Sequence, residues 1–339
     1  GLDLRTHASA ELASLIKLAP TGTHVAFSET GRLYVAALPQ TGRSVALSTV
    51  KNSDGGKSAF VTELVSAEGG EYISWNARGD ALSWSVGPYF RSFGVDSRLG
   101  ESEGAKYNEI DLSFSVAAEK PEGLVAFTNG RVITMDARRR VLNDATVLVR
   151  DNRIVALGND VEVPTTARVV DLQGQTLLPG YIDAHAHGPY GRNQIIPQQN
   201  WSLFAHLALG VTTVHDPSSI ARQVFAAAEY QRAGKILGPR IFSTGEIIYG
   251  AKSTGHDPID TLDDAKAVVA RLQDQGAISV KNYNQPRRSQ RQMVIEAARQ
   301  AGMLVVAEGG SLYQQDMNLV ADGSTGIEHN IPTLKVYDD

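Results

Sequence analysis

The amino-acid sequence predicts a multidomain protein that combines an all-β part with an α/β part. Three observations support this prediction. Residues 1–119 contain short alternating strands between turn signals, residues 124–178 show a strand, turn and strand pattern, and the chain after residue 187 alternates short apolar strands with helical stretches. The last pattern is typical of parallel βα units. With 339 residues, the chain has the length of two or three domains.

The composition narrows the classes of function. Hydrophobic residues make up 42% of the chain and charged residues 20%, as in an ordinary globular protein. The net charge of -5, without a long basic run, argues against nucleic acid or an anionic membrane as a partner. No apolar stretch reaches the roughly 18 residues of a membrane span. The chain has no cysteine, which excludes disulfides, cysteine zinc ligands and a thiol nucleophile.

Two segments of residues 1–119 resemble each other. Ala19 to Ser28 and Asn76 to Ser85 each pair a glycine turn with an alternating strand, and Arg32 to Leu38 follows the first copy as the next strand of a hairpin would. This pattern resembles the blades of TolB-type, WD40-like β-propellers, whose repeat is about 40 residues. Because the copies stand 57 residues apart, we expect an insertion at Lys51 to Ala59. Two blades cannot close a propeller, so the resemblance implies a partial one.

A small β domain is predicted over residues 120–178. The turn signal Asp151-Asn152 separates two of its strands, as in a tight hairpin. The strings Asn-Gly-Arg-Val-Ile at 129–133 and Asp-Asn-Arg-Ile-Val at 151–155 resemble the small β-sandwich that precedes the barrel in many members of the amidohydrolase superfamily. Four strands are expected here, at Leu124 to Met135, Ala145 to Val149, Arg153 to Leu157 and Ala167 to Leu172.

The first strand of the α/β part carries two histidines, His185 and His187, at alternate positions. If residues 181–187 form a strand, both imidazoles leave the same face. The string Pro-Gly-Tyr-Ile-Asp-Ala-His-Ala-His at 179–187 resembles the first barrel strand of the amidohydrolase superfamily, metal-dependent hydrolases built on a (β/α)8 barrel, in which it supplies two metal ligands. The alternative is a pair of histidines satisfied on a half-buried strand.

The resemblance implies a TIM-type (β/α)8 barrel over residues 179–339. Helices are expected at Ser219 to Gly234, Asp263 to Gln275 and Ser289 to Ala301, where apolar residues recur at helical spacing. About six strands are recognisable. After the first, they are Gly210 to Asp216, Arg240 to Ser243, Ile278 to Lys281, Met303 to Glu308 and Gly326 to His329.

The remaining candidate ligands close these strands, where the chemistry of such barrels is located. Reading the strand ends gives His215 or Asp216, Lys281, Glu308 and His329. In the resembling family, a lysine from strand four and histidines from strands five and six hold one or two divalent ions. The implied metal ligands are therefore His185, His187, Lys281, Glu308 and His329.

Lys281 matches the lysine that many members of the family carboxylate with carbon dioxide. A carbamate offers two anionic oxygens that can bridge two ions, whereas an ammonium offers none. The alternative is a cation at the barrel mouth that pairs with Glu308 or with substrate. Glu308 replaces the usual strand-five histidine, and it could instead orient a water or be structural. We expect zinc, with manganese or iron as alternatives, and a Lys281 carbamate if the site holds two ions.

Substrate contacts are predicted from position alone for His256 and Glu246, in the loop after strand three, and for His215. The pattern is most similar to the imidazolonepropionase-like and Xaa-Pro dipeptidase-like branch. This resemblance implies hydrolysis of an amide, cyclic amide or peptide-like bond of a small molecule by a metal-activated water. The alternatives are a non-catalytic binding protein that keeps part of the metal site, and a metal-dependent deaminase of a cyclic substrate.

Only about 150 residues follow His187, whereas a complete barrel needs about 250. We therefore expect a chain that is truncated after strand six and lacks the strand-eight aspartate that handles the proton in the family, so no catalytic residue is assigned. A homo-oligomer is left open. The TolB-like pattern implies an extracytoplasmic setting, periplasmic or secreted, with the cytoplasm as the alternative.

Overall fold

The chain folds into two compact units. The computed structural model describes residues 13–38, 62–95, 99, 106–193, 195–250, 256–285, 287–310 and 312–329. The first unit comprises Gly1–Phe114, Asp216–Phe225 and Phe242–Asp339, and the second comprises Ser115–His215 and Ala226–Ile241. The expected insertion at Lys51 to Ala59 lies outside the described residues.

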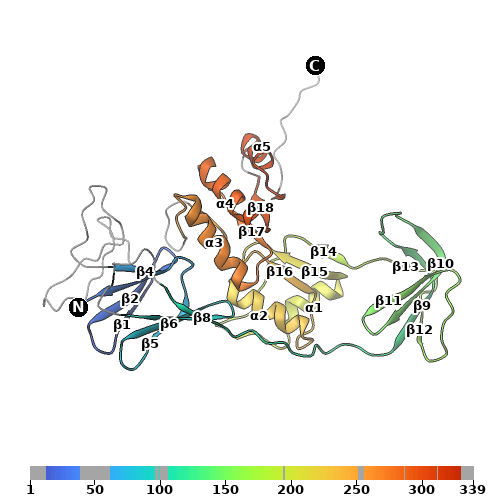
Figure 1. Ribbon diagram of the computed structural model, residues 1–339. Coiled ribbons are helices and arrows are strands. Elements are labelled where there is room, and N and C mark those ends of the chain that lie inside the picture. Colours follow the sequence, from blue (N-terminus) through green and yellow to red (C-terminus); the bar gives the residue numbers. More distant parts are fainter. Residues whose placement is uncertain are drawn as a thin grey trace, which may run out of the picture. The chain divides into compact units, whose positions relative to one another are not determined.

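The first unit begins with two four-stranded antiparallel sheets (Figure 1). In both sheets each strand pairs with the next one in sequence, and the two predicted repeats form the second strand of each sheet, β2 and β6. The predicted hairpin after the first repeat is confirmed by the pairing of β2 with β3. A propeller stays a prediction, since the described residues before β9 form these two sheets alone. The strands are β1 (Leu15–Leu18), β2 (His24–Glu29), β3 (Arg32–Ala37), β4 (Thr62–Ser66), β5 (Glu71–Trp75), β6 (Ala81–Val86), β7 (Tyr89–Gly94) and β8 (Asn108–Asp111).

One apolar core joins the two sheets. Leu82, Trp84 and Val86 alternate along β6 and are buried, so they leave one face of the strand. They pack with Leu33 and Val35 of β3 in a single cluster. The burial of these side chains is the main term that stabilises the pair of sheets.

A parallel three-stranded sheet forms the α/β part of the first unit. It consists of β17 (Ser279–Asn282), β18 (Leu304–Glu308) and β19 (Gly326–Glu328), in this order. Helix α3 (Leu262–Gln275) precedes β17, α4 (Arg288–Gln300) precedes β18, and α5 (Tyr313–Ala321) precedes β19. The helices α3 and α4 lie side by side (Figure 1).

Local signals set the bounds of α3. Thr261 and Asp264 form a capping box at its start, and Gly276 ends it with a left-handed φ of 115°. The predicted helix over Asp263 to Gln275 is therefore confirmed. Helix α5 was not predicted, because no regular apolar spacing marks it in the sequence.

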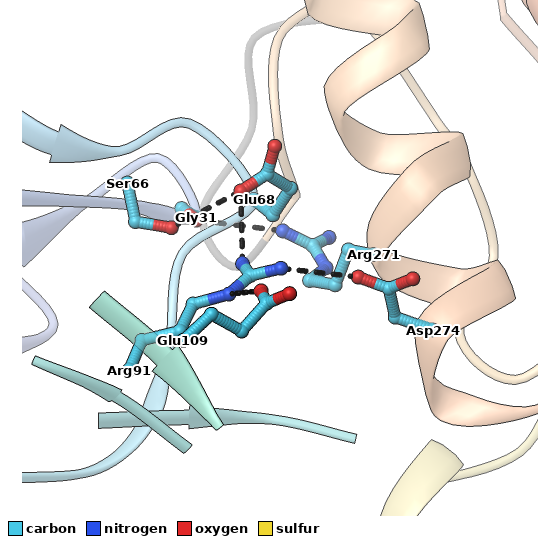
Figure 2. A network of polar contacts seen from close by, with 7 residues as sticks. All are labelled: Gly31, Ser66, Glu68, Arg91, Glu109, Arg271 and Asp274. Carbon is cyan, nitrogen blue, oxygen red and sulfur yellow. Dashed lines mark hydrogen bonds and ion pairs between the residues drawn. The ribbon is translucent and has the colours of Figure 1, made fainter. Parts of the chain in front are cut away.

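Charged side chains connect α3 to the two antiparallel sheets (Figure 2). Arg91 of β7 is 5% exposed and pairs with Glu68, with Glu109 and with Asp274 of α3, at 3.0, 2.7 and 3.3 Å. Arg271 of α3 donates a hydrogen bond to the carbonyl oxygen of Gly31, in the turn between β2 and β3. The two antiparallel sheets, α3 and the sheet of β17, β18 and β19 all belong to the first unit.

The second unit contains a mixed five-stranded sheet. Its strand order is β11-β10-β9-β12, and β13 also pairs with β9. The predicted Asp151-Asn152 hairpin is confirmed, since Arg150 of β10 pairs with Arg153 of β11. The described strands form one sheet, so a second layer of the expected sandwich is not among them. The strands are β9 (Leu124–Ile133), β10 (Val141–Arg150), β11 (Arg153–Gly158), β12 (Arg168–Asp171) and β13 (Thr176–Leu177).

A further three-stranded sheet has the order β14-β15-β16, in which β14 and β15 run parallel. A strand lies at each of the six predicted barrel positions, although the first is shorter than expected. The six strands form two three-stranded sheets, and the described part of the chain contains no closed barrel. No described helix has the length and apolarity needed to cross a membrane. The elements of this region are β14 (Tyr181–Asp183), α1 (Trp201–Ala208), β15 (Val211–Asp216), α2 (Ala221–Arg232) and β16 (Arg240–Ser243).

Candidate metal centre

Lys281 lies at the end of β17 and is 2% exposed. Its Nζ is 2.6 Å from Oε2 of Glu308 and also pairs with the carboxylate of Glu328. Glu308 closes β18 and Glu328 closes β19, and the two residues are direct partners across the parallel strands. The ends of three neighbouring strands therefore bring one amine between two carboxylates that are 8% and 7% exposed.

This cluster has a surplus of negative charge. Two carboxylates against one ammonium leave a formal charge of -1 in a buried place, where an unpaired charge is costly. His329 follows β19 with a left-handed φ of 63°, and its Nδ1 lies 3.0 Å from Oε1 of Glu308. Glu308 thus contacts Lys281 with one oxygen and His329 with the other.

The predicted strand over residues 181–187 is wrong, because β14 ends at Asp183. The side chain of Asp183 accepts a hydrogen bond from the backbone N–H of His185 at 3.0 Å, which turns the chain after the strand. His185 and His187 nevertheless lie together, with ring centroids 5.0 Å apart and planes inclined by 79°. The turn, rather than strand alternation, brings the two imidazoles to one place.

His215 supports this turn. Its carbonyl oxygen accepts a hydrogen bond from the N–H of Ala186 at 3.0 Å, and its ring Nδ1 lies 3.3 Å from the carbonyl oxygen of Ala184. The end of β15 is thereby attached to the segment that carries the histidine pair. The described contacts of His215 hold this backbone, and its substrate contact stays a prediction.

The donor types in both units suit a divalent ion. Imidazole nitrogens and carboxylate oxygens are the ligands that zinc and manganese accept. Among the residues that the structure describes, no three histidine, aspartate or glutamate side chains are arranged as a finished metal site. The histidine pair lies in the second unit and the Lys281 cluster in the first. A single centre that unites them stays a prediction.

A cavity of about 400 Å³ in the first unit is lined by Glu246 and His256, two of the three residues that were predicted to contact substrate. The loop that carries Glu246 runs along β17, since the N–H of Ile248 donates a hydrogen bond to the carbonyl oxygen of Lys281 at 2.9 Å. Tyr249 also lines the cavity, with its ring centroid 5.6 Å from that of His256. The cavity thus lies next to the strand that carries Lys281.

Glu246 has a structural contact in this cavity. Its Oε1 accepts a hydrogen bond from the N–H of Ala221 at 3.0 Å, which satisfies a donor at the start of α2. Glu71 lies close by, and burial raises the pKa of its carboxyl group; Arg222 opposes this shift and the carboxylate of Glu246 adds to it. Glu71 and Glu246 thus lie close enough to influence each other, with Arg222 and Arg271 as the opposing cations.

Sequence reasoning missed four residues around the cavity. Asp257 and Arg271 form an ion pair of 2.5 Å in its wall. The side-chain amide of Gln290 donates hydrogen bonds to the carbonyl oxygens of Gly250 and Ile259, at 2.7 and 2.9 Å, and so closes the base of the loop between them. Gln285 donates to the carbonyl oxygen of Ile248 at 3.3 Å. Their partners are distant in sequence, so no local pattern marks them.

Comparison with known proteins finds relatives named imidazolonepropionase and dihydroorotase, which match short segments of the chain. No protein-family model matches the chain. An imidazolonepropionase from Paenarthrobacter aurescens (strain TC1) is 38% identical over 58 residues, which are 17% of this chain and 14% of that protein. A dihydroorotase from Mycobacterium tuberculosis (strain ATCC 25618 / H37Rv) is 49% identical over 41 residues, 12% of this chain and 10% of that protein.

Solved structures show the same kind of fold. A prolidase in complex with N-methylphosphonate-L-proline superposes with a TM-score of 0.50 and 21% identity, over 61% of each chain. At this identity, the likeness concerns the fold. The matched segments span about a tenth to a seventh of the length of the two curated relatives.

Proposed function

We propose that this chain carries metal-binding strands of a hydrolase that cleaves an amide, cyclic amide or peptide-like C–N bond with a metal-activated water. The observation that carries this proposal is Lys281, buried between Glu308 and Glu328 at the ends of three adjacent parallel strands. Relatives named imidazolonepropionase, dihydroorotase and prolidase support a hydrolase that acts on C–N bonds. Members of the superfamily generally use divalent metals.

The residues present suit such a metal. His185 and His187 would supply two imidazole nitrogens, and the Lys281 cluster would supply anionic oxygens. If Lys281 is carboxylated, its buried place holds a third negative charge in place of a positive one, which requires cations nearby. A bound divalent ion would supply a hydroxide near neutral pH and polarise the scissile carbonyl.

The substrate is proposed to enter the cavity beside β17. Tyr249 and His256 offer aromatic faces, and Arg271 offers a cation whose charge is shared with Asp257. Gln290 donates hydrogen bonds to the carbonyl oxygens of Gly250, next to Tyr249, and of Ile259, three residues after His256. These residues would bind and orient a small amide, while the strand ends hold the reacting water.

A non-catalytic binding protein is the second candidate. It is favoured by one observation: the ammonium of Lys281 already contacts both carboxylates, so the cluster contains a cation of its own without a metal. In that case, carboxylation of Lys281 would not occur.

Elemental analysis of the purified chain separates the two candidates. The chain is reconstituted with zinc, manganese and bicarbonate, and bound metal is measured for the parent, His185→Ala and Lys281→Ala. The hydrolase proposal expects two ions in the parent and fewer in both variants. Reconstitution with ¹³C-bicarbonate would add a carbamate signal in the NMR spectrum that Lys281→Ala lacks. A parent chain without metal and without this signal would contradict the proposal.

A further inference from the structure

The start of helix α1 is bonded to the segment that carries the histidine pair. We call residues 183–189 the histidine segment, because His185 and His187 lie within it. The side-chain Nδ2 of Asn200, the residue that precedes α1, donates a hydrogen bond to the carbonyl oxygen of Pro189 at 2.7 Å. Pro189 ends the histidine segment, two residues after His187. A side chain from outside the segment thus contacts its backbone close to the imidazoles.

Asn200 also begins the helix. Its Oδ1 accepts a hydrogen bond from the backbone N–H of Ser202 at 3.0 Å, which is the contact of an N-cap residue. Aspartate and serine make this contact as well as asparagine does, since it requires only a side-chain oxygen. The amide N–H groups are not needed for capping. The bond to Pro189 is therefore a second use of Asn200, and one orientation of the amide satisfies both contacts.

The bond to Pro189 lies in a buried place, because Asn200 is 7% exposed. A buried donor or acceptor that loses its partner costs free energy, so the amide nitrogen and the carbonyl oxygen are both most stable when they stay together. The bond therefore restricts the position of Pro189 relative to α1.

The other end of α1 faces the start of the histidine segment. Nδ1 of His206 lies 2.8 Å from the carbonyl oxygen of Ser202, so this nitrogen carries a proton. Its Nε2 lies 3.8 Å from Oδ2 of Asp183, whose Oδ1 accepts the N–H of His185. The distance of 3.8 Å is longer than a hydrogen bond. Asn200 therefore makes the closer of these two contacts.

We propose that Asn200 is a positioning residue for the histidine pair: its bond to Pro189 fixes the histidine segment and thereby sets how tightly His185 and His187 bind a metal. This inference rests on the proposed function. Strand β15 holds the middle of the segment through the N–H of Ala186, and Asn200 holds its end. Residues that orient metal ligands change metal affinity about 10- to 100-fold. Because Asn200 acts on the backbone and not on an imidazole, we expect the lower value of about 10-fold.

Two variants of the full chain separate positioning from capping. Asn200→Ser keeps an oxygen for the cap but is too short to reach Pro189 as well, and Asn200→Ala loses both contacts. If Asn200 positions the pair, both variants should bind cobalt(II) about 10-fold more weakly than the parent, and Asn200→Ala should have the lower midpoint of thermal unfolding. Thr261→Ala is the matched control, because it removes the N-cap of α3. It should lower the midpoint of unfolding and leave the affinity for cobalt unchanged.

Hydrogen exchange of the metal-free chain gives a second readout. The backbone N–H of His185 donates to Asp183 and that of Ala186 donates to the carbonyl oxygen of His215, both at 3.0 Å. These two amides report on the order of the histidine segment. Asn200→Ser should make both exchange several-fold faster than in the parent, whereas Thr261→Ala should not.

The two readouts separate this inference from the proposed function. If Asn200→Ser binds cobalt as tightly as the parent, the positioning role is overturned and the hydrolase proposal stays intact. A parent chain that binds no metal would contradict the hydrolase proposal. Exchange rates in Asn200→Ser equal to those of the parent would show, with or without metal, that Asn200 does not hold the segment.

Discussion

Two buried cations of the first unit, Arg91 and Lys281, are each surrounded by carboxylates. Arg91 is 5% exposed and contacts Glu68, Glu109 and Asp274 (Figure 2). Lys281 is 2% exposed and contacts Glu308 and Glu328. The surroundings are alike in charge, but the two cations differ in their chemistry.

Arg91 connects β7 to β8, to α3 and to the turn that carries Glu68 by ion pairs. Each of its three guanidinium nitrogens takes one carboxylate, and the ring of Tyr107 lies 5.0 Å from its central carbon. Burial lowers the pKa of Arg91, but Glu109, Tyr107 and Glu68 outweigh this effect and raise it. A guanidinium stays protonated at any physiological pH and presents its donors in a fixed plane, so it can join three partners and react with nothing.

Lys281 has the opposite properties. An ammonium is a compact charge on a flexible stem, and it can lose its proton and become a nucleophile. It stands at a strand end, beside a cavity and next to a histidine that its own partner Glu308 contacts. Two buried cations in similar surroundings thus differ in the reactions open to them, and we expect the side-chain type to distinguish a structural ion pair from a reactive one.

The largest effect is expected for Arg91→Met. Removing the guanidinium leaves three carboxylates without their shared cation, which should lower the free energy of unfolding by about 3–5 kcal/mol. Arg91→Lys keeps a charge but not the planar fork, and it should cost about 1–2 kcal/mol. Urea unfolding followed by circular dichroism measures both. Folded Arg91→Lys should bind the same amount of metal as the parent, and a loss of metal would contradict a purely structural role.

The reciprocal change, Lys281→Arg, should spare the fold and remove the chemistry. The guanidinium can pair with Glu308 and Glu328, but it cannot form a carbamate. Bound metal should fall below two ions, and the carbamate signal from ¹³C-bicarbonate should be absent. Unchanged metal content would show that Lys281 is a cation of the same kind as Arg91.

Features that depend on neighbouring residues could be predicted from the sequence. Strand β16, the end of α3 at Gly276 and the hairpin at Asp151-Asn152 follow from signals within a few residues, and all three agree with the structure. Lys281 and Glu308 were identified because they close strands. This rule uses only the position of a residue at a strand end, so it applies even when the residues that contact it are unknown.

Other features depend on contacts between distant residues. Arg91 meets Asp274 across 183 positions of sequence, and nothing near either residue indicates this pair. Glu328 was not predicted to be part of the site, because the adjacent His329 was assigned as the metal ligand at the end of this strand. The turn at Asp183 had a signal, since an aspartate two residues before His185 favours an Asx turn. Strand alternation was assumed instead.

Gly31 offers a smaller test of the contact between the sheets and α3. Gly31 and Gly22 both have a left-handed backbone, with φ of 73° and 72°. A Cβ at Gly31 would collide with the carboxylate of Asp257, whereas a Cβ at Gly22 would meet nothing within 4 Å. Gly22→Ala should cost about 1–2 kcal/mol from backbone strain alone. Gly31→Ala should cost about 1 kcal/mol more in thermal unfolding, and equal costs would mean that Asp257 moves away freely.

The smallest effects concern two aspartates of α3 with opposite pKa shifts. Burial raises the pKa of Asp264, but hydrogen bonds from Thr261 and Arg32 outweigh it, so the pKa lies below its usual value of about 3.9. Burial raises the pKa of Asp274; Arg91 opposes this shift and Glu68 and Glu109 add to it, and the pKa lies above its usual value. Asp264 therefore stabilises the fold above pH 4 and loses this effect on acidification, whereas ionisation of Asp274 costs stability as the pH rises from about 4 through its raised pKa.

Asparagine variants should show this difference in their pH dependence. Asp264→Asn should destabilise the protein by about 1 kcal/mol at pH 7, as expected for a lost capping box, and the deficit should shrink as the pH falls below 4. Asp274→Asn resembles the protonated aspartate, so it should match the parent at low pH and equal or exceed its stability at pH 7. Urea unfolding at several pH values measures both slopes. If the free energies of unfolding of both variants depended on pH in the same way, Asp274 would have no raised pKa. The three carboxylates around Arg91 would then repel one another no more than Asp264 is repelled beside Arg32.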